Sequence, residues 1–239
     1  MATAAWLGLA AACSTMTLII FVRYLVVSGV FVWIGEKRRP GLHKGLSRQM
    51  RHEVAWSSVS SLIYAVPAAI AAWGWHAHGW TKIYTELQPR DVWWIPLSLI
   101  LVLLFHDSWF YWTHRLMHRP RLFKLVHAVH HKSRPPTAWA AMAFHPLEAV
   151  TGAIFVPIIV FVLPLHIAVV GAVLAIMTLM GAANHAGWEI LPQSLVRGKI
   201  GNWLISATHH EVHHRFYSRN FGLYFRFWDR LMDTDGGLK

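Results

Sequence analysis

Apolar residues in this chain gather in long blocks, and polar or basic segments separate these blocks. Each block reaches or approaches the roughly 20 apolar residues that an α-helix needs to cross a bilayer. The sequence therefore predicts about five membrane spans. They lie within Ala4–Ile34, from about Val54 to Trp75, from about Val92 to Trp112, and in a helical hairpin of Val150–Leu163 and Ile167–Ala183 that turns at residues 163–166.

The expected fold class is all-α, a multi-pass membrane helical bundle of about 4–5 spans in one domain covering residues 1–239. Residues 1–104 hold the N-terminal spans, and residues 105–239 form a histidine-rich catalytic region that includes the hairpin near 148–185. The first block is expected to be a retained helix and not a signal peptide, because it is long and its first basic residue is Arg23. We expect Arg23 to snorkel to the interface or to face other helices.

Basic residues follow the first span, the third span and the last span, in the stretches 37–51, 115–134 and 197–230. An odd number of spans with the N-terminus outside would place all three stretches in the cytosol, as the positive-inside rule favours. The same arrangement places the histidine clusters on that side. The sequence thus predicts an integral membrane protein with its active site in a helical cap on the cytosolic face.

The formal net charge of +11 changes this picture little. In a soluble protein such a charge would suggest nucleic acid, but these basic residues flank membrane spans. Attraction to anionic lipid headgroups is the simpler explanation, and no nucleic-acid partner is expected. A basic cytosolic face would also suit an acidic electron carrier. The single cysteine, Cys13, offers neither a disulfide nor a thiolate metal site.

The candidate chemistry lies in histidines that recur at helical spacings. Offsets of three and four residues place side chains on one face of a helix, so each cluster can direct its imidazoles to one point. Nine of them are predicted metal ligands: His114, His118, His127, His130, His131, His185, His210, His213 and His214. Nine imidazoles exceed one four-coordinate zinc site but fit two metals, so a dimetal site is expected, with no catalytic residue beyond it.

Five further residues are candidates for orienting a ligand or for binding metal directly: Asp107, His145, Asn184, His209 and Glu211. Asp107 lies within about 20° of both His114 and His118 on a helical wheel, where its carboxylate could accept the second ring N–H of a ligating imidazole. Pairing of Asp107 with Arg115 is the alternative. Asn184 precedes His185 and could hold a water molecule, and Glu211 lies between predicted ligands.

As a set, these motifs resemble the sterol desaturase/fatty acid hydroxylase superfamily. They are Asp107-x-x-x-Tyr111-x-x-His114-Arg-x-x-His118, His127-x-x-His130-His131, His145-Pro-x-Glu148, His209-His210-x-x-His213-His214 and Phe227-Trp228-Asp229-Arg230, within about residues 105–235. The resemblance implies a di-iron centre held almost entirely by histidines, which oxidises a lipid hydrocarbon with O2. Arg119 departs from the pattern, because that place is often histidine. A fused haem domain is also missing, so we expect electrons from a separate ferredoxin or cytochrome-type protein.

Several alternatives stay open at this point. Imidazole also suits zinc, copper and nickel, so purified protein could carry zinc in place of iron. The favoured hypothesis is hydroxylation of a sterol-like or other isoprenoid lipid, a carotenoid ring or a fatty acyl chain, with desaturation as the alternative. A membrane metal transporter is a different class of hypothesis. Transporters, however, usually hold ligands near the bilayer midplane beside broken helices, and these clusters lie outside the spans. The sequence does not indicate an oligomeric state.

Overall fold

The computed structural model describes residues 2–238, and most of them are α-helical. Four helices are long and apolar enough to cross a membrane: α1 (Ala2–Arg38), α2 (Ser47–His78), α3 (Asp91–Met117) and α7 (Ile167–Asn184). The fourth of the five predicted spans, Val150–Leu163, appears as a shorter apolar stretch in two pieces, α5 (Pro146–Ala153) and α6 (Phe155–Val162). The structure thus gives four full-length candidate spans and one shorter segment.

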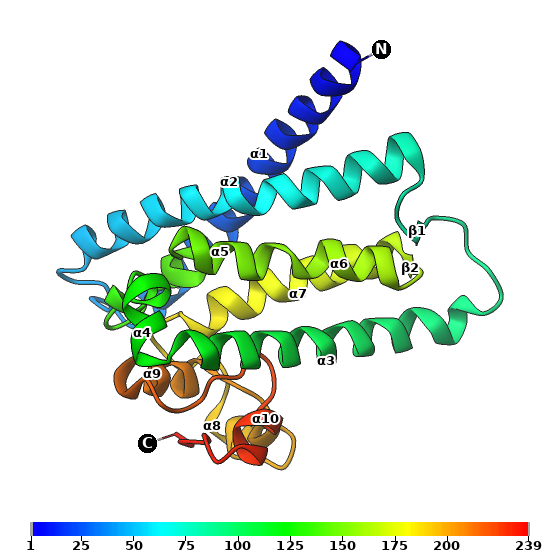
Figure 1. Ribbon diagram of the computed structural model, residues 1–239. Helices are drawn as coiled ribbons and strands as arrows, with labels where there is room; N and C mark the ends of the chain where they lie inside the picture. The colour runs from blue at the N-terminus through cyan, green and yellow to red at the C-terminus, as the bar shows by residue number, and fades with distance from the viewer. Residues whose placement is uncertain (1, 239) are drawn as a thin grey trace.

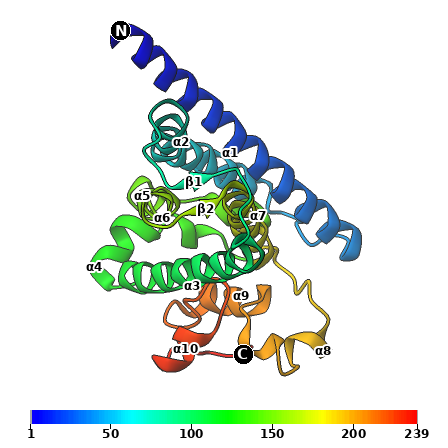
Figure 2. The ribbon, with the colours of Figure 1, turned by 90° about the vertical axis from the view of Figure 1, so that its right-hand side faces the viewer.

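Helices α2, α3 and α7 and the α5–α6 stretch run side by side, while α1 crosses α2 at an angle and its N-terminus projects away from the bundle (Figures 1 and 2). Strand β1 (Ile83–Tyr84) pairs in parallel with β2 (Leu165–His166), which ties the α2–α3 connection to the turn between α6 and α7. The interior is apolar, and Val102, Phe155 and Val169 belong to its buried cluster. Outward-facing apolar residues such as Leu18 and Ile100 are exposed, as expected of side chains that face lipid.

The remaining elements are short, and they gather at the end of the bundle where α3 and α7 finish and beneath the last turns of α3 (Figure 1). These elements are α4 (Pro120–Leu122), η1 (Phe123–His127), η2 (His130–Lys132), η3 (Ala138–Met142), α8 (Gln193–Val196), η4 (Gly201–Trp203), α9 (Ala207–Phe216) and α10 (Phe227–Leu231). Every predicted metal ligand lies in this group or at the helix ends beside it.

This topology makes a prediction about the two sides of the bundle. Lys44 precedes α2 and Glu86 follows it, so α2 separates two exposed positions. In a Cys13→Ala background, we expect Lys44→Cys and Glu86→Cys to react with a membrane-impermeant maleimide from opposite sides. Labelling of intact cells against inverted vesicles measures this, with Glu86→Cys expected to react in intact cells. Labelling of both from one side would contradict the bundle as a membrane-crossing unit.

Candidate metal centre

Nine buried or partly buried imidazoles form two groups, and within each group the candidate ligand atoms lie within 4.8 Å of one another. One group contains His114, His118, His127, His131 and His213, and the other contains His130, His185, His210 and His214. They come from the end of α3, the η1–η2 segment, the end of α7, and α9. The structure therefore brings together the nine histidines that the sequence nominated as ligands.

Helical spacing explains how each cluster divides between the groups. Histidines four residues apart share a group, as in His127 with His131 and His210 with His214, because one helical turn returns a side chain to the same face. The intervening His130 and His213 each belong to the opposite group. The repeated H-x-x-H-H pattern therefore supplies both groups from each segment, which places the two groups side by side.

Hydrogen bonds decide which ring nitrogen carries the proton in several of these imidazoles. The Nδ1 atom of His114 lies 2.9 Å from the carbonyl oxygen of Phe221, and that of His213 lies 2.7 Å from the carbonyl oxygen of Arg219. The Nδ1 atom of His185 lies 2.7 Å from the carbonyl oxygen of Gly181. A carbonyl oxygen only accepts, so each Nδ1 must donate and each Nε2 presents a lone pair.

Those Nε2 lone pairs face other Nε2 atoms at short distance. The His114–His127 pair is 3.1 Å apart, and His185 lies 3.1 Å from His130 and 2.9 Å from His210. The Nε2 atom of His131 lies 3.2 Å from those of both His118 and His213. Two imidazole nitrogens bound to one metal at about 2.0–2.1 Å, in tetrahedral or octahedral directions, would lie about 2.8–3.4 Å apart. The donor set therefore fits a metal ion in each group.

Burial keeps these imidazoles neutral at pH 7. Loss of hydration lowers the pKa of His118 to about 2 and that of His185 to about 4, with His114 adding to the effect at His118. Burial, followed by neighbouring imidazoles, also holds the pKa of His210 and His214 well below the usual value. Neutral imidazole is the form that binds metal, so no proton has to be displaced from these lone pairs near neutral pH.

A buried carboxylate completes the surroundings of His127. The Oε1 atom of Glu148 lies 2.7 Å from Nδ1 of His127, and both side chains are almost fully buried. A carboxylate beside the second ring nitrogen is a common feature of metal-bound histidines, since it fixes the tautomer and raises ligand basicity. Glu148 belongs to the motif His145-Pro-x-Glu148, but the sequence did not predict its contact with His127. The available indication was Pro146, because proline favours the first turn of a helix and so places Glu148 in the first turn of α5.

The segment 219–225 orients two of the imidazoles, because its carbonyl groups accept from His114 and His213. Asp107 Oδ1 accepts from the backbone N–H groups of this segment at Leu223, Tyr224 and Phe225, at 2.7–3.3 Å. The expectation that Asp107 would accept from an imidazole is therefore wrong, because His114 donates to Phe221 instead. The alternative pairing with Arg115 is also not seen, since that guanidinium donates to the Tyr111 hydroxyl.

Asn184 holds the same segment, because its Nδ2 donates to the Leu223 carbonyl at 2.9 Å. The sequence suggested that the Asn184 amide could hold a water molecule. In the structure its Nδ2 group instead donates to the backbone. Asp229 adds a further anchor by accepting from the N–H groups of Phe221 and Gly222. Three polar side chains from α3, α7 and α10 thus fix one backbone segment.

The other three candidates lie outside both groups. His145 caps α5, with Nδ1 accepting from the Leu147 N–H at 3.3 Å. His209 forms a capping box with Ser206 at the start of α9. Glu211 is exposed on α9. His145 and His209 therefore cap the N-termini of helices. Glu211 lies on the exposed face of α9 and points away from both groups.

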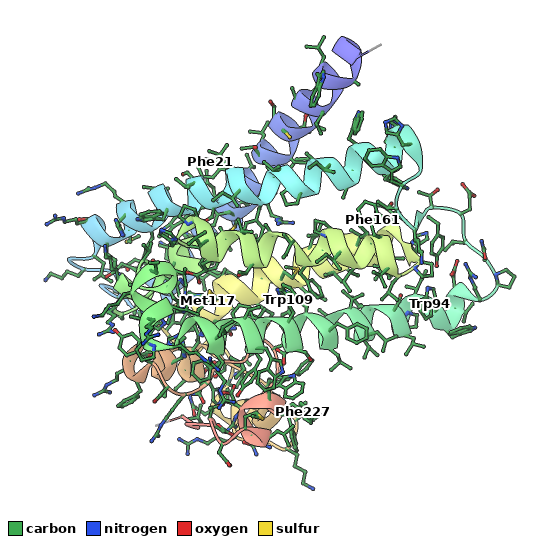
Figure 3. All side chains as sticks on the ribbon, in the orientation of Figure 1. Phe21, Trp94, Trp109, Met117, Phe161 and Phe227 are labelled. Atoms are coloured by element: carbon green, nitrogen blue, oxygen red, sulfur yellow. The ribbon has the colours of Figure 1, made fainter. Side chains whose placement is uncertain are left out.

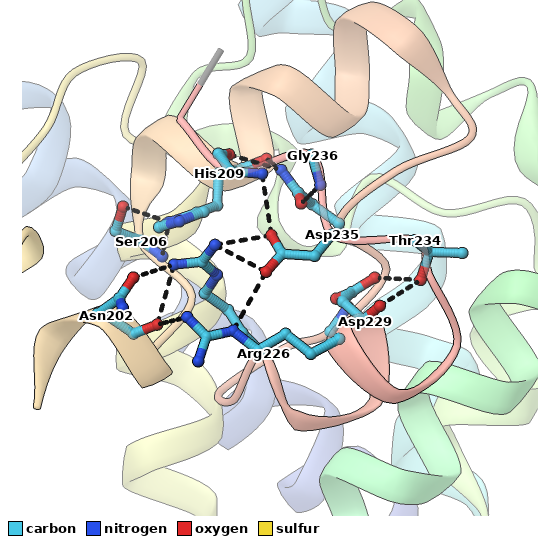
Figure 4. A network of polar contacts seen from close by, with 12 residues as sticks. Asn202, Ser206, His209, Arg226, Asp229, Thr234, Asp235 and Gly236 are labelled. Atoms are coloured by element: carbon cyan, nitrogen blue, oxygen red, sulfur yellow. Dashed lines mark hydrogen bonds and ion pairs between the residues drawn. The ribbon is translucent and has the colours of Figure 1, made fainter.

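An ion-pair network holds the C-terminal segment against α9 (Figure 4). Arg226 donates to both carboxylate oxygens of Asp235 at 2.7 Å and to the Asn202 side chain at 2.7 Å. Asn220 connects this region to α9, because its Nδ2 donates to the His209 carbonyl at 2.9 Å. The network is a structural support for the segment that orients His114 and His213, and it was not visible as a unit in the sequence.

A largely apolar cavity adjoins the two groups and is lined by side chains of α1, α2, α3, α5 and α7. Its wall includes Phe110 and Phe144, whose rings lie 5.0 Å and 5.2 Å from those of His114 and His130. Trp109 and Met117 also line it, and Figure 3 marks both along α3 between the middle of the bundle and the histidine-bearing end. The empty space is about 900 Å³ including the open mouth.

The role of Asp107 yields a prediction. Asp107→Asn should lower both thermal stability and metal retention, because three backbone N–H groups lose a charged acceptor and the segment that orients His114 and His213 loosens. We expect a metal affinity about 10–100-fold weaker, as changes around ligands usually produce. Metal titration with thermal unfolding measures both, with exposed Glu211→Gln as the control. Wild-type metal affinity in Asp107→Asn would contradict this role.

Comparison with known proteins adds an independent result. Residues 99–234 match the family model of the fatty acid hydroxylases. Human lathosterol oxidase is 29% identical over 78% of this chain and 61% of its own length. A Delta(7)-sterol 5(6)-desaturase of Gibberella zeae is 32% identical over 63% of this chain and 45% of its own length. The C-4 methylsterol oxidase of Schizosaccharomyces pombe is 33% identical, over 61% and 48% respectively.

In each of these three comparisons the aligned part is less than two thirds of the relative's own length. No solved structure matches the chain. The family model covers more than half of the chain and includes all nine grouped histidines. This chain therefore belongs to the fatty acid hydroxylase family, which confirms the resemblance found in its motifs.

Proposed function

We propose that this protein is a membrane-bound di-iron oxygenase that oxidises a C–H bond of a lipid with O2 and external electrons. The observation that carries the proposal is the pair of histidine groups, in which Nε2 lone pairs converge at spacings suited to metal ligands. Imidazole ligands alone do not distinguish iron from zinc or copper. Membership of the fatty acid hydroxylase family is what supports iron as the metal. Zinc could replace iron in purified protein.

The protein's own residues would hold and orient the metals. Five histidines would hold one iron and four would hold the other. The carbonyl groups of Phe221 and Arg219 fix the tautomers of His114 and His213, and Glu148 lies 2.7 Å from Nδ1 of His127. Bound iron would supply the activation of O2, and the protein would supply position and exclusion of water. The apolar wall formed by Phe110 and Phe144 keeps a hydrocarbon substrate beside the centre and limits access of water.

A lipid substrate could reach the cavity from the bilayer. A second apolar groove lies between α3 and α6, lined in part by Phe105, Trp112 and Ile158. Trp109 and Thr113 of α3 line both the groove and the cavity, so the two spaces share part of one wall. We infer lateral access for a sterol-like lipid, the class named in all three relatives, with a carotenoid ring or an acyl chain as other candidates.

Two outcomes of the oxidation are proposed. Hydroxylation inserts one oxygen atom, and desaturation removes two hydrogen atoms from neighbouring carbons. Hydroxylation follows from the sequence hypothesis, whereas desaturation gains support because relatives such as the Gibberella zeae protein are named sterol desaturases. Electrons would come from a separate ferredoxin or cytochrome-type protein that docks at a basic, cytosolic surface beside the centre.

The decisive experiment uses the iron-loaded full-length protein in lipid nanodiscs, with reductant, O2 and a panel of sterols, carotenoids and fatty acyl lipids. We expect an oxidised product and about two metal ions per chain. His130→Ala and His213→Ala each remove one predicted ligand from a different group and should abolish turnover while the protein still inserts. Mass spectrometry and metal analysis measure the outcome.

His145→Asn is the matched control, because Asn can cap α5 and His145 belongs to neither group. Full activity in His213→Ala would contradict the ligand assignment. An alkene as the only product would reject hydroxylation in favour of desaturation. Metal transport by proteoliposomes without oxidation of any lipid would reject the oxygenase.

A pH dependence follows from the buried imidazoles. The folded pKa of His185 is about 4, against 6.5 for a free side chain, because burial disfavours its charged form. Between these values the unfolded chain binds protons that the folded chain does not. The free energy of unfolding of the metal-free protein should therefore be highest above about pH 6.5 and should fall as the pH drops toward 4.

Thermal unfolding of metal-free protein from pH 8 to pH 5 measures this trend, and wild-type protein with His185→Gln provides the comparison. Bound metal should also dissociate in the acidic part of this range, since protons compete for the same lone pairs. A stability that rises on acidification would show that the imidazoles are not held neutral by burial.

A further inference from the structure

The cavity beside the histidine groups contains a guanidinium that the proposed oxidation chemistry does not use. Arg23 lies in the apolar helix α1 and lines the cavity together with Tyr64 of α2 and Glu148 of α5. The sequence left two expectations for this residue, snorkelling to the interface or facing other helices. The structure shows the second, because Arg23 is only partly accessible and borders an internal space.

Among the side chains described, those of residues 5–238, none forms an ion pair or a hydrogen bond with Arg23. Its Nε atom is buried and has no hydrogen-bond partner. The ion pairs of the described chain involve Arg226 and Arg230 but not Arg23. Glu148, the carboxylate that lines the same cavity, lies against His127 instead.

Such an arrangement is costly in a membrane helix. Arginine in a span usually pairs with another side chain or faces water, because an isolated charge in hydrocarbon is strongly unfavourable. Snorkelling does not relieve this cost toward the basic end of α1, since Arg38 is 15 residues away, or roughly 22 Å along the helix. The partner for this guanidinium must therefore come from the cavity, as water or as an oxygen atom of a bound ligand.

A second donor lines the same space. No hydrogen bond of the described residues involves the Tyr64 hydroxyl, which closely approaches Gly152 of α5. A Cβ atom at position 152 would lie 2.0 Å from the Tyr64 hydroxyl oxygen, so glycine is what allows this phenol to occupy its place. Arg23 and Tyr64 thus offer N–H and O–H donors to the interior of a cavity whose wall is otherwise mostly apolar.

We propose that Arg23, assisted by Tyr64, binds the oxygen-bearing end of the lipid substrate and so determines which lipids the cavity accepts. This inference rests on the proposed lipid oxidation at the histidine groups. The recognised chemistry is an acceptor oxygen at one end of a hydrocarbon, as in the hydroxyl of a sterol or the carboxylate of a fatty acid. A guanidinium suits both, because it presents several donors and retains its charge at any physiological pH.

Binding of the oxygen-bearing end at Arg23 would also orient the substrate within the cavity. An oxygen function held at Arg23 leaves the hydrocarbon to extend along the apolar wall toward Phe110 and Phe144, beside the histidine groups. The carbon that is oxidised is then set by its distance from the polar end. A lipid without that oxygen would leave both donors unpaired in a nonpolar space, which is how buried polar groups reject a ligand that lacks a partner.

The test compares lipid pairs that differ only in the acceptor oxygen, using iron-loaded full-length protein in nanodiscs. The pairs are a 3-hydroxysterol with its 3-deoxy hydrocarbon, and a long-chain fatty acid with the alkane of equal length. We expect wild-type protein to prefer an oxygenated lipid about 10–100-fold in competitive binding and in kcat/KM, mainly through KM. The pair that shows the preference identifies whether the acceptor oxygen belongs to a sterol hydroxyl or to a fatty acid carboxylate.

Arg23→Gln should reduce that preference about tenfold or more, whereas Arg23→Lys should restore part of it and Tyr64→Phe should reduce it less. Exposed Arg48→Gln is the control for general loss of positive charge. Metal content should match wild type in all variants, because neither Arg23 nor Tyr64 belongs to a histidine group. Thermal unfolding of Arg23→Gln without lipid should occur at the wild-type temperature or above it, because the substitution removes an unpaired charge. A purely structural role would lower stability and leave the preference between paired lipids intact.

The outcomes separate this inference from the proposed function. Oxidation of lipids with equal binding of both members of each pair would overturn the role of Arg23 and leave the oxygenase standing. An Arg23-dependent binding preference without any oxidation would support the lipid site and reject the oxygenase. Unchanged preference in Arg23→Gln protein that folds and retains metal would overturn the inference directly.

Discussion

The structure depends on one electrostatic constraint, the convergence of unprotonated imidazole nitrogens within two small volumes. Carbonyl oxygens fix the proton on Nδ1 of His114, His185 and His213, so their Nε2 lone pairs face other nitrogens at about 3 Å. A metal ion placed within either group would accept several of these lone pairs at once. Because this arrangement of donors exists only in the folded chain, binding of such an ion would stabilise the fold.

This constraint explains why so many buried polar groups surround the histidines. Asp107, Asn184 and Asp229 do not reach an imidazole, yet all three hold the backbone between residues 219 and 225. That backbone in turn orients His114 and His213. A network of this kind is stable only when all its members are paired, since each buried group left alone costs more than a single hydrogen bond returns.

The cavity contains unpaired hydrogen-bond donors, whereas the histidine groups contain converging acceptor lone pairs. Most of its wall is apolar, but Arg23 and Tyr64 bring donors to it without acceptors from the protein. In the proposed function, metal ions would satisfy the histidine groups, and an oxygen atom of the lipid would satisfy the donors that α1 and α2 contribute to the cavity wall. The two requirements together favour an amphipathic lipid over a plain hydrocarbon, and they connect the apolar spans to the chemistry at the histidine-bearing end.

The sequence by itself determined the apolar helices and nominated the nine histidines of the two groups, because both appear as patterns of nearby residues along the chain. Block length predicted the spans, although α5–α6 came out short and divided, and offsets of three and four residues predicted shared faces. Only the tertiary structure decided which histidine clusters meet in each group, that Asp107 and Asn184 hydrogen-bond to the 219–225 backbone, and where Arg23 lies. The backbone contacts of Asp107 and Asn184 join residues more than 35 positions apart, and no periodicity along the chain shows which backbone will lie against a given side chain.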